Sequence, residues 1–92
     1  MKDWRTAFDP ELQLWIGALE QLGCQFAWRA TDGVTAVPEP PERGAAWLEL
    51  WRHGQLLDFA GPLPQPLTFD GLLAVQRLIE QQWNVRRTSQ TY

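Results

Sequence analysis

Two pairs of side chains in this chain of 92 residues are of types that could do chemistry. Cys24 and His53 are the only cysteine and the only histidine, and together they offer a nucleophile and a base. Glu49 and Asp58 offer two carboxylates, the groups that general acid–base catalysis uses. Cys24 is expected on the core side of a strand and His53 in a turn, whereas the two carboxylates are expected on a flat sheet without a cleft. We therefore predict no catalytic residues and no enzymatic activity.

Composition argues against several other kinds of site. One cysteine and one histidine fall short of a structural metal site, and the glycines form no phosphate-binding loop, so neither a metal nor a cofactor is expected. The net charge of −3 argues against direct contact with nucleic acid, which usually needs a basic face. No apolar run approaches the roughly 20 residues of a membrane span, and the cysteine usage is typical of a reducing compartment. A cytoplasmic protein is expected.

Two amphipathic helices are predicted near the ends of the chain. Asp9-Pro10-Glu11 is a helix start, and the apolar stripe after it predicts a helix over residues 10–22, ended by Gly23. Thr68 is predicted to cap a second helix. The apolar face of that second helix is expected to consist of Phe69, Leu72, Val75, Ile79 and Trp83.

Between the helices, the pattern of β-forming residues and turns predicts two hairpins. In the first, a strand over residues 24–31 leads through a type I′ turn at Asp32-Gly33 into a short return strand over 34–37. In the second, strands over 46–52 and 55–60 meet at His53-Gly54.

The predicted fold class is α+β. One antiparallel sheet of three to four strands carries both helices on one face, in the order α-β-β-β-β-α. Residues 61–66, which contain three prolines, are predicted to form an extended connector to the last helix. The domain is predicted to span residues 9–84, between an N-terminal arm over 1–8 and a polar C-terminal tail over 85–92.

The hairpin register predicts which side chains face away from the helices. A two-residue turn at His53-Gly54 pairs Glu49 with Asp58 and assigns Leu57 and Phe59 to the core. The opposite face then combines aromatic rings with two like charges. The predicted partner-binding residues on it are Arg29, Trp47, Glu49, Trp51, Leu56 and Asp58.

Two features of this face favour a role in binding. Exposed tryptophans on a sheet often mark an interaction site, and a carboxylate opposite another is destabilising unless a cation such as Arg29 lies between them. The expected partner is a protein, a peptide or a second copy of the chain. Alternatively, the face is covered by the C-terminal tail or by the N-terminal arm, which contains Trp4 and Phe8.

One segment of the chain resembles a known family. Leu-Trp-Arg-His-Gly-Gln-Leu-Leu-Asp-Phe-Ala-Gly-Pro, followed by Pro-Leu-Thr-Phe-Asp-Gly-Leu-Leu, is similar to the small docking domains at the start of tubulysin-type synthetase subunits, over Leu48 to Ile79. The resemblance implies a dimer whose exposed hairpin, here with Trp51, Leu56 and Asp58, receives a short segment of another subunit. The chain departs from that family in having a second hairpin.

The order of the elements also resembles that of the double-stranded-RNA-binding domain. That family needs a lysine-rich start of its last helix, and Thr-Phe-Asp-Gly stands there in this chain, at residues 68–71. The resemblance is therefore one of topology alone.

Taken together, the residues predict a small non-catalytic interaction module. The alternative is an acidic inhibitor or adaptor of a nucleic-acid-processing complex, of the kind that phages encode, whose carboxylates would face a basic groove on a protein. Binding through charges would depend strongly on salt and binding through aromatic rings weakly, so the two can be separated.

Overall fold

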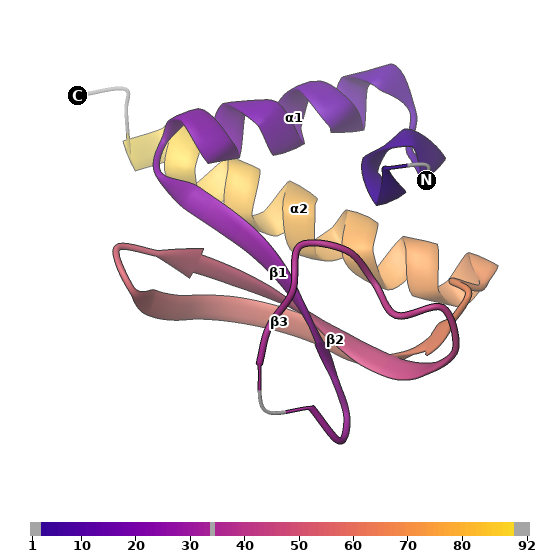
Figure 1. Ribbon diagram of the computed structural model, residues 1–92. Coiled ribbons are helices and arrows are strands. Elements are labelled where there is room, and N and C mark those ends of the chain that lie inside the picture. Colours follow the sequence, from indigo (N-terminus) through magenta and orange to yellow (C-terminus); the bar gives the residue numbers. More distant parts are fainter. Residues whose placement is uncertain (1–2, 34, 90–92) are drawn as a thin grey trace.

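The computed structural model describes residues 3–33 and 35–89. These residues form one sheet covered on one side by a layer of helices. The 3₁₀ helix η1 (Trp4–Ala7) and helix α1 (Pro10–Gln21) precede strands β1 (Cys24–Ala30), β2 (Gly44–Arg52) and β3 (Gln55–Gln65), and helix α2 (Phe69–Ser89) follows. The strands form an antiparallel sheet in the order β1-β2-β3. Figure 1 shows both helices on the same side of this sheet. The predicted α+β class is confirmed.

The prediction of a fourth strand is wrong for the part of the chain that is described. Val37 forms only an isolated bridge to Trp28, through two backbone hydrogen bonds of 2.7 Å. Pro38, Pro40 and Pro41 follow Val37, and prolines lack the N–H group that a longer ladder needs. Val34, where the predicted return strand begins, lies outside the described residues. The order of elements is therefore α-β-β-β-α after η1.

The turn after β1 also differs from the prediction. A type I′ turn needs positive φ at both of its central residues, and neither Asp32 nor Gly33 has one. Instead, the N–H of Gly33 donates to the carbonyl of Ala30 at 2.9 Å and closes a turn one residue earlier.

The predicted helix starts are confirmed by their capping bonds. The Asp9 carboxylate accepts the N–H of Leu12 at 2.8 Å, and the Thr68 hydroxyl accepts the N–H of Gly71 at 3.1 Å. The buried residues of α1 are Leu12, Ile16 and Leu19.

Helix α2 begins where predicted but differs from its prediction in its apolar face and in its end. Phe69, predicted for the apolar face, is 74% exposed. The buried apolar side chains of the helix begin with Val75, nearly two turns later, and include Leu78 and Ile79. The helix continues through residues 85–89, since no proline or glycine interrupts it, so this part of the predicted polar tail is helical. Residues 90–92 of that tail lie outside the described part of the chain.

Strand β3 is longer than predicted and includes most of the predicted connector. Ala46 of β2 pairs with Leu63, whose buried side chain anchors the strand to the core. Pro62 and Pro64 are compatible with this position because β3 is an edge strand, where a missing N–H need not break a ladder.

The N-terminal arm packs into the core on the helix side of the sheet. The buried Trp4 ring meets Phe8, Phe26 and Trp28 edge to face, with centroids 6.1, 5.7 and 5.5 Å apart. Phe26 and Trp28 belong to the buried face of β1. The alternative in which this arm covers the opposite face is therefore wrong, because Trp4 and Phe8 belong to the hydrophobic core on the helix side.

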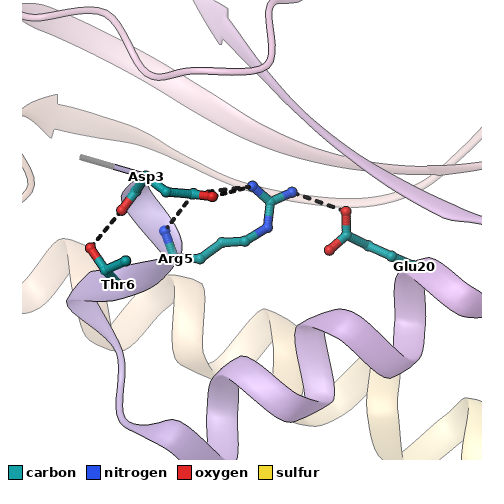
Figure 2. A network of polar contacts seen from close by, with 4 residues as sticks. All are labelled: Asp3, Arg5, Thr6 and Glu20. Atoms are coloured by element: carbon teal, nitrogen blue, oxygen red, sulfur yellow. Dashed lines mark hydrogen bonds and ion pairs between the residues drawn. The ribbon is translucent and has the colours of Figure 1, made fainter. Parts of the chain in front are cut away.

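A polar network fixes the arm to the end of α1. The Arg5 guanidinium donates to Asp3 at 3.1 Å and to Glu20 at 3.0 Å, and Figure 2 shows it stretched between the two carboxylates. The same group lies 4.8 Å from the centroid of the Trp4 ring, a cation–π distance. The network therefore holds Trp4 in its core position from the solvent side.

Candidate interaction surface

The side of the sheet away from both helices is here called the outer face. Residues of β1 and β2 form one part of it. The register pairs Ala27 with Glu49 and Arg29 with Trp47. Directly paired residues share a face, and the residues between them, Leu48 and Leu50, are fully buried under the helices. Arg29, Trp47, Glu49 and Trp51 therefore lie together on the outer face, as the alternation of the sequence predicts.

The predicted pairing of β2 with β3 holds next to the turn and fails beyond it. Trp51 pairs with Leu56 as predicted, and His53 and Gly54 have the positive φ values, 53° and 74°, of a type I′ turn. The register then shifts, so that Leu50 pairs with Asp58 and Leu57 is the extra residue of a β-bulge.

This bulge reverses the faces of the residues that follow it. Phe59, predicted for the core, pairs with Glu49 on the outer face and is 51% exposed. Asp58 turns toward α2, where the amide of Gln82 donates to its carboxylate at 3.4 Å. The predicted pair of Glu49 with Asp58 is therefore wrong, and the bulge removes the like-charge contact that would have destabilised a regular hairpin.

Glu49 is the polar centre of the outer face. Arg29 Nε donates to both of its oxygens, at 3.3 and 3.2 Å, and the indole N–H of Trp51 donates to Oε1 at 3.1 Å. The Glu49 side chain is 12% exposed, so this carboxylate is held by its neighbours and largely withdrawn from solvent. The cation predicted beside the acidic centre is thus present, paired with one carboxylate instead of two.

A hollow of about 270 Å³ lies beside this ion pair. Its lining residues are Arg29, Trp47, Glu49, Leu56 and Phe59. The rings of Trp47 and Phe59 meet edge to face with centroids 5.2 Å apart, and Leu56 is 41% exposed. The lining of the hollow is therefore apolar except for the Arg29–Glu49 ion pair.

The structure brings most of the predicted site residues together. Trp51 lies outside the hollow but donates to Glu49, and Asp58 belongs to the helix side. Phe59 is the residue that sequence reasoning missed. The signal for it was the unfavourable pair of Glu49 with Asp58 in a regular register, which a bulge before Asp58 relieves.

The free edge of β3 is poorly suited to pairing with another strand. The N–H of Phe59 donates to the Asp58 carboxylate at 2.8 Å, and Pro62 and Pro64 have no N–H to donate. Prolines and occupied donors are devices that block edge-to-edge pairing of sheets. A partner of β3 is therefore expected to use the face of the strand in preference to its edge.

Cys24 and His53, the nucleophile and base considered for catalysis, are not among the residues that line the hollow. Cys24 is buried, and burial raises the pKa of its thiol, whereas His53 is exposed in the turn. Within residues 3–33 and 35–89, no group of three or more histidine, cysteine and acidic side chains could hold a metal ion. No helix in this part of the chain is long and apolar enough to cross a membrane.

Comparisons of the chain with family models, with curated proteins and with solved structures found no match. The function is therefore argued from the chemistry of the outer face itself.

Proposed function

We propose that this protein is a small non-catalytic docking module that binds a protein or peptide partner through its outer sheet face. The observation that carries the proposal is the exposure of Phe59 and Leu56 beside a hollow whose other apolar wall is Trp47. Aromatic side chains are enriched among the residues that dominate binding at interfaces. Bulges often re-aim a side chain next to a functional site, and this one turns Phe59 toward the outer face.

Two further observations support docking on the face. The N-terminal arm, which could have covered it, is packed on the helix side with Trp4 in the core. At the edge of β3, the N–H of Phe59 is bonded to Asp58 and two prolines lack an N–H, so addition of a partner strand there is disfavoured.

The experiment compares two exposed phenylalanines in an affinity capture from nuclease-treated lysate of the source organism. Phe59→Ser changes the outer face, and Phe69→Ser is its matched control, because Phe69 is also exposed but lies at the start of α2. We expect a discrete protein to be retained by the wild type and by Phe69→Ser and lost from Phe59→Ser. Retention of every captured protein by Phe59→Ser would refute docking through the outer face.

Salt dependence distinguishes this mode from the alternative of an acidic inhibitor or adaptor. Docking on apolar rings should change little when salt is raised, since charges on the outer face are paired internally. Binding that is lost between low and high salt, and that survives Phe59→Ser, would instead favour recognition through the carboxylates.

A further inference from the structure

We infer that the hollow beside Glu49 receives one large apolar side chain, of the size of leucine or phenylalanine, from a locally uncharged peptide segment. The inference rests on the proposed function and names the chemistry of the occupant. It follows from the size of the hollow, from the state of its charges and from the area around it.

The hollow is large enough for a large apolar side chain. Its volume of about 270 Å³ exceeds the roughly 150 Å³ of a protein cavity that binds benzene, so a leucine or phenylalanine side chain fits in it. Trp47, Leu56 and Phe59 form its walls, so a branched or aromatic side chain placed between them contacts carbon atoms on several sides.

The charges of the hollow favour a neutral occupant. Glu49 already accepts hydrogen bonds from Arg29 and from the Trp51 indole, and the Arg29 Nε is used for that carboxylate. A lysine or glutamate side chain entering the hollow would lose its hydration without gaining an unpaired opposite charge, which is unfavourable. An apolar side chain has no such cost.

The exposed apolar area argues against a second copy of the chain as the occupant. Phe59 and Leu56 together expose roughly 200 Å², and the partly exposed rings of Trp47 and Trp51 raise this to at most roughly 400 Å². Each partner in a standard-size interface contributes about 800 Å², of which roughly 450 Å² is apolar, and homodimer interfaces are larger and more apolar. The exposed apolar area of these four side chains is therefore sufficient for a short segment and below what a stable dimer needs.

The test uses single amino acids with blocked ends as probes of the hollow. N-acetyl-leucine amide and N-acetyl-phenylalanine amide are titrated into the ¹⁵N-labelled full chain, with N-acetyl-lysine amide and N-acetyl-glutamate amide as charged counterparts. The NMR signals followed are the Trp47 indole N–H and the Arg29 Nε–H, which lie at the hollow. We expect saturable shifts with the two apolar amides, with dissociation constants on the order of millimolar for molecules of this size, and none with the charged ones.

Two variants locate the binding. Phe59→Ser should weaken the binding of the apolar amides by at least about fivefold, whereas Phe69→Ser should leave it unchanged. The dispersion of the amide spectrum reports whether each variant is folded. Leu56→Ser provides a second wall variant with the same expectation, should Phe59→Ser unfold.

Several outcomes would overturn the inference. These are absence of saturable shifts at Trp47 and Arg29, equal shifts with the charged amides, or a dimer at micromolar concentration that Phe59→Ser dissociates in sedimentation equilibrium. If one of these outcomes is observed while Phe59→Ser still loses its partner in the capture experiment, docking on the outer face stands. Only the inference of a single apolar side chain in the hollow is then rejected. Failure of the capture experiment as well would reject both.

Discussion

The bulge at Leu57 makes a quantitative prediction about Phe59. In a regular hairpin Phe59 would lie in the core, and truncation of a buried phenylalanine to alanine costs about 3–5 kcal/mol of stability. In the structure Phe59 is 51% exposed, so about 100 Å² of its ring area is buried. At about 25 cal/mol per Å², an upper estimate for folding, burial of this area contributes about 2.5 kcal/mol. With no closed cavity left behind, Phe59→Ala should therefore cost about 2–3 kcal/mol, its contact with Trp47 included.

The assay is equilibrium unfolding in guanidinium chloride, followed by far-UV circular dichroism so that a lost tryptophan does not alter the signal. Trp28→Ala serves as the reference for a core site, because Trp28 is fully buried and should cost at least about 3–5 kcal/mol. The comparison requires two-state transitions with similar m-values. A cost for Phe59→Ala above about 3 kcal/mol, or equal to that of Trp28→Ala, would mean that Phe59 is a core residue and that the reasoning from the bulge is wrong.

Three other predictions concern the arm and the thiol. Trp4→Ala should destabilise the fold by about 3 kcal/mol in chemical unfolding, because the ring is buried among three others, and a cost below about 1 kcal/mol would contradict its core position. The Arg5 backbone N–H, followed by the Arg5 side chain, lowers the pKa of Asp3, so its carboxylate stabilises the folded state above its unfolded pKa and loses this contribution as pH falls through the lower folded pKa. Melting temperatures should therefore fall more steeply for the wild type than for Asp3→Asn between about pH 5 and pH 2, and parallel curves would contradict this. Burial raises the pKa of Cys24, so iodoacetamide should modify the native protein at least about a hundredfold more slowly than the unfolded chain; equal rates would show that the thiol is accessible.

Local features of the sequence were sufficient to predict where both helices begin and the tight turn of the second hairpin. Asp9 and Thr68 cap helices through bonds to residues three positions away, and His53-Gly54 forms its turn within four residues. Such signals depend on neighbours in the chain and need no knowledge of distant contacts. The same holds for the alternation that places Arg29, Trp47 and Glu49 on one face.

Contacts between distant segments determined the register of β3 and the position of the N-terminal arm. A one-residue bulge at Leu57 exchanged the faces of Asp58 and Phe59, because Asp58 gains Gln82 of α2 as a partner and avoids Glu49. The N-terminal arm entered the core because Trp4 finds the rings of β1 beside α1. Sequence patterns determine which residues are apolar and where turns form, but a shift of one residue reverses the side of a strand, and only the packing of the whole chain selects that register.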